Sequence, residues 1–326
     1  MVDITVVIAT HNGAHVLQRT LQGYVDVAAS DANWKIVLVD NASTDATAQI
    51  IQSFTGQLPL TALYVGQPGK NEALNAAISE LEGEIVVLSD DDAIPQSGFL
   101  DAWRAAFKRM PEYDLFGGEI DLLFEEPPPD WFLREQPRFE ELYSLRKGVA
   151  EGPIQPDQIF GPNMAVRRRL FDENMRFDTR IGPNSTDPNY GMGSETEFCV
   201  RSVRQGYRSG FANGPQVLHI VRPHQIRQDF WDGRAYRLGR GLASKQIATG
   251  ELKLRRRSRP VRLAGGVWKR VQRLRLRGLA ALPADEATRF GRRWEYNLAC
   301  GFHDEMLRVK KLSTPPPGQV TAPSSL

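Results

Sequence analysis

The stretch Glu84–Ser89 (EIVVLS) and the three aspartates after it, Asp90, Asp91 and Asp92, decide how this chain is interpreted. The apolar run is typical of a buried β-strand, so it places three carboxylates at one strand end. Burying carboxylates is costly unless a cation compensates their charge. Oxygen ligands of this kind suit Mg²⁺ or Mn²⁺, which often bind phosphate as well. The run therefore indicates a metal-assisted enzyme acting on a phosphorylated substrate, or else a solvated acidic turn before Pro95.

Around this strand, the first part of the chain alternates strand and helix patterns. Short β-branched apolar runs predict strands, and apolar residues at helical spacing after capping or proline residues predict helices. The predicted strands are Ile4–Thr10, Trp34–Asp40, Thr61–Gly66, Glu84–Ser89 and Phe116–Phe124. The predicted helices are 14–25, Ser43–Phe54, Asn71–Leu81 and 95–109. This alternation predicts an α/β fold with a mainly parallel sheet flanked by helices.

The predicted strands of this sheet end in polar residues. Because ligands of parallel sheets bind at the carboxyl ends of the strands, these residues are expected to share one site. The three clusters are Thr10, His11 and Asn12; Asp40 and Asn41; and Asp90, Asp91 and Asp92. A single cluster would be explained by helix capping, which we expect of Ser43 or Asp45. Three clusters at one edge favour a binding site.

The composition is that of a globular protein, with 326 residues, 41% hydrophobic and 25% charged. The two cysteines, Cys199 and Cys300, match no metal or redox spacing, so we expect free thiols in a reducing compartment. The first residues, MVDITVVIAT, lack the basic leader of a signal peptide, and no apolar stretch reaches about 18 residues. These features predict a cytoplasmic protein without a membrane-spanning helix.

The regular alternation weakens beyond residue 115. The three prolines in Glu125–Phe132 exclude regular structure, so this segment is predicted to be an active-site loop or plain surface. From about residue 225 the pattern is helical, and 313–326 has the composition of a disordered tail. We expect a domain over 1–224, divided at residue 115, then a basic helical extension over 225–312.

In this order, the motifs resemble those of the inverting glycosyltransferase family 2, of the GT-A fold. The resemblance covers about residues 2–224 and combines signals that are individually weak. It implies that 1–115 is the nucleotide-binding half of the domain and 116–224 the acceptor-binding half. The motifs are VVIATHNGAHVLQRTL, VLVDNASTDAT, GKNEALNAAISELEGEIVVLSDDDAIP, FGPNMAVRRRLF, GMGSETEFCVRSVRQGY and VLHIVRPH. Membership would imply transfer of a sugar from a nucleotide-diphosphate donor, with a divalent metal, Mn²⁺ or Mg²⁺, stabilising the leaving diphosphate.

The resemblance also implies roles for individual residues. Asp92 would bind the metal and His219 would be a third ligand, unless His219 is structural. Asp90 would contact the ribose or a metal-bound water, and Asp91 would be the variable middle residue, free to be solvated. The remaining donor-site residues are Thr10, His11, Asn12, Asp40, Asn41, Lys70, Asn75 and Asn163. For Asp40 the alternative is a helix cap, and for Lys70 it is a surface lysine rather than a phosphate ligand.

The acceptor hydroxyl needs a general base. The segment GSETEF occupies the place of the family's acidic motif, usually an adjacent Glu-Asp pair, and it makes Glu195 the predicted base. Ser194 stands where an acid is common. Glu197 is the alternative base, although a helix over 194–200 would turn it away from Glu195. The QxxRW motif of processive synthases is missing, since FGRRW (Phe290–Trp294) lacks the glutamine, so we expect transfer of a single sugar.

Charge is concentrated in one segment. Residues 251–280 contain 11 Lys and Arg and one acid, which leaves 30 basic and 38 acidic residues elsewhere, a net charge of −8. This segment is predicted to be an amphipathic basic helix that lies on an anionic membrane surface, or that packs on the domain with a solvated face. A lipid-linked glycan acceptor would suit the first alternative. The acidic remainder argues against a nucleic acid partner.

Two other functions were compared with the glycosyltransferase. A sugar-phosphate nucleotidyltransferase uses a related sheet and aspartates, but HNGAH after the first strand is no glycine-rich phosphate loop. A degenerate, non-catalytic relative that binds nucleotide is favoured only by Ser194. The leading expectation is therefore a non-processive glycosyltransferase in surface polysaccharide or glycoconjugate assembly, peripheral to the inner face of the membrane.

Overall fold

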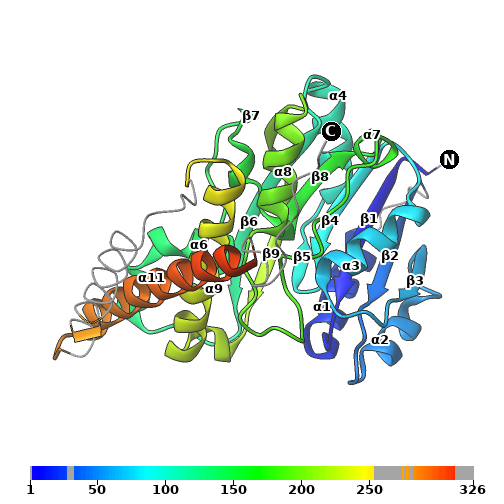
Figure 1. The fold of residues 1–326 in the computed structure, drawn as a ribbon. Helices are drawn as coiled ribbons and strands as arrows, with labels where there is room; N and C mark the ends of the chain where they lie inside the picture. Colours follow the sequence, from blue (N-terminus) through cyan, green and yellow to red (C-terminus); the bar gives the residue numbers. More distant parts are fainter. Residues whose placement is uncertain (1, 28–32, 253–273, 275–276, 279–281, 313–326) are drawn as a thin grey trace, which may run out of the picture. The chain divides into compact units, whose positions relative to one another are not determined.

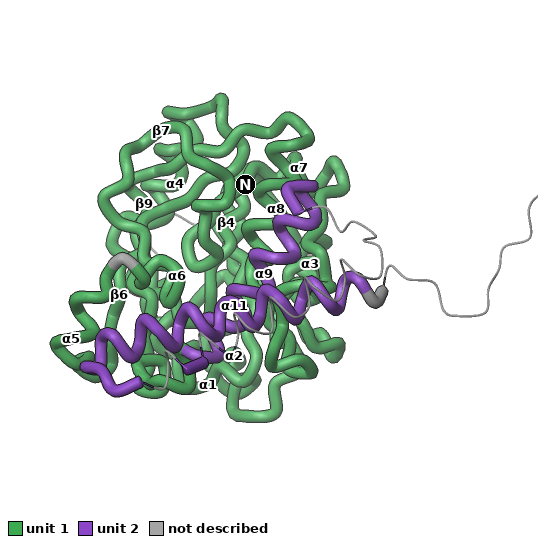
Figure 2. Tube along the Cα trace, turned by 60° about the vertical axis from the view of Figure 1, so that its left-hand side comes forward, with its two compact units in different colours: residues 1–231 green, residues 232–326 purple. Residues whose placement is uncertain are grey.

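We describe the protein from a computed structural model that covers residues 2–27, 33–252, 274, 277–278 and 282–312. The chain divides into two compact units, residues 1–231 and 232–326 (Figure 2). Unit 1 holds the sheet and every predicted site residue. The predicted tail 313–326 and most of the predicted basic helix in 251–280 lie outside the described residues.

Unit 1 is built on a mixed sheet. The described residues form nine strands: β1 Ile4–Thr10, β2 Trp34–Asp40, β3 Leu60–Tyr64, β4 Ile85–Asp90, β5 Ala93–Pro95, β6 Leu115–Phe124, β7 Gly152–Pro153, β8 Met164–Arg167 and β9 Ser209–Val221. Their order is β3-β2-β1-β4-β8-β6-β9-β5, with β7 paired to β9 (Figure 1). The pairs among β3, β2, β1 and β4 are parallel, whereas β8 is antiparallel to its neighbours. The predicted fold class is confirmed.

Helices and short turns connect these strands. The α-helices of unit 1 are α1 Ala14–Val27, α2 Thr47–Phe54, α3 Lys70–Ala76, α4 Phe99–Arg109, α5 Asp130–Leu133, α6 Phe139–Tyr143, α7 Arg169–Asp172 and α8 Ser194–Arg204. The 3₁₀ turns are η1 Ala77–Glu80, η2 Gln136–Arg138, η3 Pro156–Gln158, η4 Gly161–Asn163 and η5 Pro223–Ile226. Two further helices, α9 Gln228–Ala248 and α11 Glu286–Leu312, provide most of the described part of unit 2.

The central strands β1, β2 and β4 are buried on both faces, which explains why most of their residues are apolar. Val6 and Ile8 of β1 belong to one hydrophobic cluster, together with Trp103 of α4. Val7, between them in sequence, belongs to a second cluster with Phe198 of α8. Because side chains alternate along a strand, one strand contributes to two cores, and the strands hold the site rigidly between them.

Three predicted boundaries need correction. Pro95 does not open a helix, because residues 93–95 pair antiparallel with β9 as β5, and α4 begins only at Phe99. The helix predicted from Ser43 begins at Thr47, after a loop that Asp45 stabilises by accepting a hydrogen bond from the Thr47 backbone N–H at 3.0 Å. The segment after β6 is not wholly irregular, because Asp130–Leu133 forms the short helix α5.

In unit 2, two glycines allow α9 and α11 to pack closely. A Cβ at Gly239 would lie 2.1 Å from the Leu298 carbonyl oxygen, and one at Gly301 would lie 1.9 Å from that of Tyr236. No side chain larger than hydrogen fits such contacts. In the described part of the chain, no helix is both long enough and apolar enough to span a bilayer.

Candidate active site

The carboxyl ends of β1 and β2 form one side of the site. Thr10 is paired with Asp40 in the parallel register, so the loops that follow these strands lie together. The loops are joined by hydrogen bonds, since the Asn12 backbone N–H donates to Ser43 Oγ at 2.9 Å and Asn12 Oδ1 accepts from the Thr44 backbone N–H at 2.8 Å. Asn12 has a φ of 52°, a left-handed conformation that asparagine tolerates better than most residues.

Asp40 and His11 are held within the same loops. Asp40 is 7% exposed, and its Oδ1 accepts a hydrogen bond from the Ser43 backbone N–H at 3.0 Å. This contact closes a turn before α2 and does not cap the helix itself. His11 is exposed, and its Nδ1 lies 2.6 Å from the Asn41 carbonyl oxygen. Since a carbonyl only accepts, His11 carries its hydrogen on Nδ1.

Asn41 positions the next part of the site. Its Nδ2 donates to the carbonyl oxygens of Val65 and Gln67 at 3.1 and 2.7 Å, and its Oδ1 accepts from the Gly69 backbone N–H at 2.7 Å. All three contacts fix the loop between β3 and α3. Asn41 therefore places Lys70, the first residue of α3, at the edge of the acidic cluster.

Lys70 links two of the predicted site residues. Its Nζ lies 2.5 Å from Asp90 Oδ1 and 2.7 Å from Glu195 Oε1. Burial alone would lower the pKa of Lys70, but the attraction of both carboxylates outweighs it and raises that pKa. Burial would likewise raise the pKa of Glu195, whereas the charge and hydrogen bond of Lys70 lower it to about 2. In this state Lys70 is a cation and Glu195 is an anion.

Glu195 lies at the start of α8 and packs against η4. The Ser194 hydroxyl donates to Glu195 Oε2 at 2.8 Å. Gly161 of η4 is buried, and a Cβ there would lie 2.5 Å from Glu195 Oε1, so only glycine allows this approach. Glu197 points elsewhere and pairs with Arg201, with 2.7 Å between Oε1 and Nε. Glu195 is thus the acid that contacts Lys70, and Glu197 is turned away from it, as expected for a helix over this segment.

Asp91 differs from its prediction as a solvated residue. It is half-buried, and its Oδ2 accepts a hydrogen bond from the Thr10 hydroxyl at 2.5 Å. Burial and the neighbouring Asp92 charge raise the pKa of Asp91 to about 7, although the Thr10 hydroxyl opposes the shift. A Cβ at Gly13 would lie 2.4 Å from Asp91 Oδ2, which shows how closely the loop after β1 covers this carboxyl.

Asp92 is 7% exposed and lies beside two cationic or ionisable groups. His219 Nε2 lies 3.2 Å from Asp92 Oδ1, and Arg222 Nη2 lies 3.3 Å from Asp92 Oδ2. Burial would raise the pKa of Asp92, but His219 and then Arg222 lower it to about 2. Burial would lower the pKa of His219, but Asp92 outweighs it and raises that pKa.

A hydrogen bond to the backbone of Tyr143 orients the ring of His219. Its Nδ1 lies 2.7 Å from the backbone oxygen of Tyr143, so Nδ1 carries a hydrogen and Nε2 faces Asp92. Metal-binding histidines are commonly held in this way, with the second ring nitrogen donating to a carbonyl. The Tyr143 hydroxyl donates to the Gln225 carbonyl oxygen at 2.8 Å and accepts from Trp231 Nε1 at 3.0 Å.

This donor set can accommodate a divalent ion. One carboxylate oxygen of Asp92 and the Nε2 of His219 are side by side, and oxygen with imidazole nitrogen suits Mn²⁺. Within the described ranges, no group of three His, Cys, Asp or Glu side chains is arranged for a metal. Two protein ligands leave further positions for substrate oxygens or water, as is usual for ions that bind with a nucleotide.

Two predicted donor-site residues hydrogen-bond to the backbone of other segments. Asn75 exchanges hydrogen bonds with the backbone of Phe177, at 2.9 Å in both directions. Asn163 is fully buried, and its Nδ2 donates to the carbonyl oxygens of Glu119 and Pro215 at 2.8 and 3.0 Å. In both residues the side-chain nitrogen therefore donates to backbone carbonyl oxygens.

Sequence reasoning missed Arg222 and Tyr143. Arg222 lies three residues after His219 in a segment with several basic residues, so composition did not single it out. Its Nη1 lies 2.9 Å from His15 Nε2, across the sheet edge from α1. Tyr143 acts partly through its backbone oxygen, for which a sequence carries no signal. The pairing of β9 with β5 brings the end of β9, and with it Arg222, to the site, whereas Tyr143 comes from α6.

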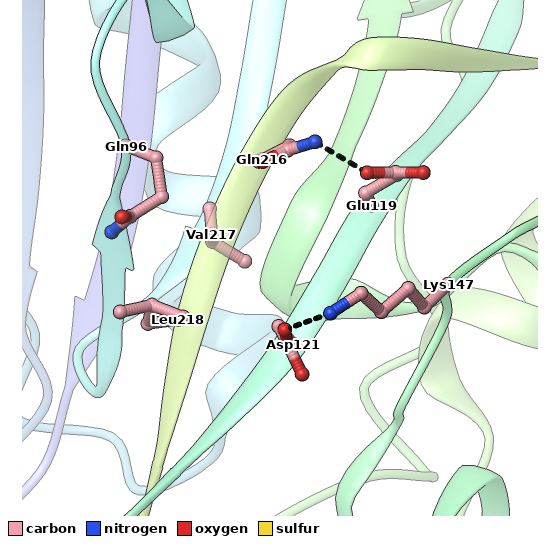
Figure 3. A pocket seen from close by; sticks show the side chains of 7 residues that line it. All are labelled: Gln96, Glu119, Asp121, Lys147, Gln216, Val217 and Leu218. Atoms are coloured by element: carbon pink, nitrogen blue, oxygen red, sulfur yellow. Dashed lines mark hydrogen bonds and ion pairs between the residues drawn. The ribbon is translucent and has the colours of Figure 1, made fainter.

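A separate hollow lies on another part of the sheet. A cavity of about 210 Å³ is lined by residues of β6, β9 and neighbouring segments, none of them a predicted site residue (Figure 3). Its lining residues are Gln96, Glu119, Asp121, Lys147, Gln216, Val217 and Leu218. The charged groups are paired, because Gln216 Nε2 donates to Glu119 Oε2 at 2.5 Å and Lys147 bonds Asp121. It is distinct from the acidic cluster.

A mixed sheet with an acidic cluster at the end of β4 is typical of enzymes that have the GT-A fold. Residues 5–174 match the profile of the family described as Glycosyl transferase family 2. Since this match spans more than half of the chain, the protein belongs to that family.

Known relatives agree with this assignment. The glycosyltransferase AglE of Haloferax volcanii is 24% identical over 223 residues, which cover 68% of this chain and 67% of AglE. Among solved structures, residues 1–349 of Staphylococcus aureus TarS with UDP-GlcNAc superpose with a TM-score of 0.51 and 15% identity. That match covers 95% of this chain and 91% of the TarS fragment, whereas the chain spans 46% of a longer TarS chain.

A second structural neighbour is the mannosyltransferase PcManGT of Pyrobaculum calidifontis, solved with GDP-Man and Mn²⁺. It has a TM-score of 0.56 and 20% identity, covering 95% of this chain and 87% of PcManGT. At such identities the structures establish the shared fold.

Proposed function

We propose that this protein is a metal-dependent, inverting glycosyltransferase that moves one sugar from a nucleotide-diphosphate donor to a hydroxyl acceptor. The observation that carries the proposal is the meeting of Lys70, Asp90 and Glu195 beside Asp92 and His219. In this proposal, these residues supply a cation, a carboxylate base and two metal ligands. Family membership and neighbours that bind UDP-GlcNAc and GDP-Man support the donor class.

In this proposal, the loops after β1 and β2 receive the nucleoside. Thr10, Asn12 and Asp40 lie beside one another there, and the buried carboxylate of Asp40 would accept a hydrogen bond from a base. His11 and Asn41 hold the shape of these loops. Both uridine and guanosine diphosphates belong in the test, because the structural neighbours were solved with UDP-GlcNAc and GDP-Man.

The reacting groups would lie deeper in the site. Asp92 and His219 would hold the divalent ion, which, when bound, stabilises the negative charge of the leaving diphosphate. Lys70 is placed to add a second positive charge on that diphosphate. Glu195 would take the proton of the acceptor hydroxyl. At the same time the oxygen of that hydroxyl would bond to the anomeric carbon, and the bond between this carbon and the diphosphate would break. Attack opposite the leaving group inverts the anomeric centre.

The finer parts of the proposal rest on sequence. Transfer of a single sugar is supported by the lack of a QxxRW string, and Phe290 and Trp294 of the nearest string are buried in α11. A cytoplasmic location at an anionic membrane surface, with a lipid-linked glycan as acceptor in polysaccharide or glycoconjugate assembly, remains a proposal from the basic segment 251–280.

A thermal-shift screen tests the donor class first. The full chain is heated with UDP, GDP, dTDP or CDP, each with and without Mn²⁺, because a ligand of the native state raises the melting temperature. We expect one diphosphate to stabilise the protein, and to do so more strongly with Mn²⁺. Stabilisation by none of the four would contradict the proposal. D92A should keep its fold but lose the Mn²⁺-dependent part of the shift and the turnover.

A further inference from the structure

Lys70 contacts two carboxylates that have different tasks in the proposed reaction. Its Nζ bonds both Asp90 and Glu195, and the three side chains are only 17%, 22% and 18% exposed in that order. Asp90 belongs to the metal-binding loop, whereas Glu195 belongs to the acceptor side. A single ammonium group therefore neutralises the donor side and the base at the same time.

We propose that Lys70 is a shared cation that leaves Glu195 for the diphosphate of the donor, so that Glu195 can accept the acceptor's proton only after the donor has bound. This inference rests on the proposed function, in which Glu195 is the base. Nothing in the family assignment requires that the base be paired with a lysine before the donor arrives.

The contact with Lys70 determines how strong a base Glu195 is. A carboxylate with a pKa near 2 is a weak proton acceptor at neutral pH, since a general base works best with a pKa near the operating pH. Burial alone would raise the pKa of Glu195, and it is chiefly Lys70 that keeps this pKa low. When the ammonium group turns to the diphosphate, Glu195 becomes a stronger base in the same position.

The local structure lets Lys70 move without disturbing the fold. Its backbone is fixed, because Asn41 holds Gly69 and the Lys70 backbone N–H donates to the Pro183 carbonyl oxygen at 2.9 Å. Gly69 has a φ of 142°, which favours glycine at this turn. Beyond the backbone, the lysine has a flexible four-carbon stem, so a rotamer change is enough to redirect the charge.

Competition for one cation has a thermodynamic signature that a merely structural lysine does not have. If Glu195 and the diphosphate compete for Lys70, removal of the Glu195 charge makes Lys70 fully available. E195Q should then bind the diphosphate more tightly while its turnover falls. Most substitutions in a binding site weaken the ligand, so a gain in affinity together with lost turnover separates the two explanations.

The test is a double-mutant cycle on the full chain by isothermal titration calorimetry. UDP and GDP are each titrated with Mn²⁺ into the wild type, E195Q, K70Q and the double variant. E197Q is the matched control, because it removes the same charge from the same helix but from a residue paired with Arg201. Turnover is followed as UDP release from UDP-GlcNAc and GDP release from GDP-Man.

We expect E195Q to bind the preferred diphosphate about three- to tenfold more tightly, in the range of coupling between contacting groups. The gain should vanish in the K70Q background, and E197Q should bind like the wild type. K70R keeps the positive charge, so adding E195Q to K70R should still tighten diphosphate binding. The comparison of K70R with K70R/E195Q replaces the K70Q cycle if K70Q does not fold.

Other results would overturn particular parts. Equal affinity of E195Q and wild type, or an equal gain without Lys70, would overturn the shared cation and leave the glycosyltransferase proposal standing. Wild-type turnover by E195Q would instead overturn Glu195 as the base. Failure of both diphosphates to bind any variant would overturn the proposed donor and the inference together.

Discussion

Substitution of Gly161 by alanine tests the position of Glu195 without changing its chemistry. Gly161 belongs to η4 and is not in a left-handed conformation, so alanine fits the backbone. The added Cβ would lie 2.5 Å from Glu195 Oε1 and 2.9 Å from its Cδ. Glu195 must therefore move, while its charge and Lys70 remain.

The size of the effect follows from these distances. Ordinary van der Waals contact begins at 3.4 Å, so the carboxylate has to shift by about 0.9 Å. Misplacement of a reacting group by about 1 Å can cost about 100-fold in rate. The displaced atoms are the end of a flexible side chain, so the free energy of unfolding should fall by only about 1 kcal/mol. For a chain of this size, that corresponds to a melting temperature about 2–4 °C lower.

The assay is the release of UDP or GDP from UDP-GlcNAc or GDP-Man by G161A, with melting temperatures measured in parallel. We expect kcat to fall about 10- to 100-fold. G56A is the control, because a Cβ at Gly56 meets no atom within 4 Å. A G161A protein with kcat within about twofold of the wild type would show that Glu195 need not hold its position, and would refute its role as the base.

Three further outcomes are expected. H219Q should weaken Mn²⁺ binding about 10- to 100-fold, measured by calorimetry with UDP or GDP present. Y143F removes a buried hydroxyl that bonds the Gln225 carbonyl and Trp231 Nε1, so its free energy of unfolding should fall by about 1–3 kcal/mol in urea titrations. The depressed pKa of Glu195 stabilises the fold above its unfolded value of about 4.5 and ceases to do so as pH falls toward 2. E195Q should thus be less stable than wild type at pH 7, by about 2 kcal/mol, but not near pH 2.

The parts of the fold that sequence could predict are those governed by local pattern. Unbroken β-branched runs such as Ile4–Thr10 have few other interpretations, and parallel strands bring their carboxyl ends to one edge. Thr10, Asp40 and Asp90 follow from that rule alone. The short strand β5 did not, because three residues that include Pro95 become a strand only by pairing with Val217–His219. Long-range pairing of this kind leaves no periodicity in a short segment.

The same limit applied to the site. Glu195 could be assigned from its motif, but its contact with Lys70 joins residues 125 positions apart. Asp91 appeared to be the least constrained of three aspartates, whereas the loop after β1 folds back and places Thr10 against it. Asn163 was assigned from the motif FGPNMAVRRRLF, which gives no sign that its amide donates to Glu119 and Pro215 beside the register shift between β6 and β9. The local sequence therefore predicts which residue types react, whereas their contact partners are determined by the tertiary fold.

The groups that balance the charge of the three aspartates show most clearly how the structure differs from the expectation. Three successive aspartates suggested that a metal ion makes the cluster tolerable. In the structure each carboxyl already has a partner from the protein: Lys70 at Asp90, the Thr10 hydroxyl at Asp91, and His219 with Arg222 at Asp92. A divalent ion or a diphosphate that enters must therefore displace or share existing contacts. Binding at this site is an exchange of partners, and for that reason we expect variants of the partner side chains to change affinity as much as variants of the aspartates.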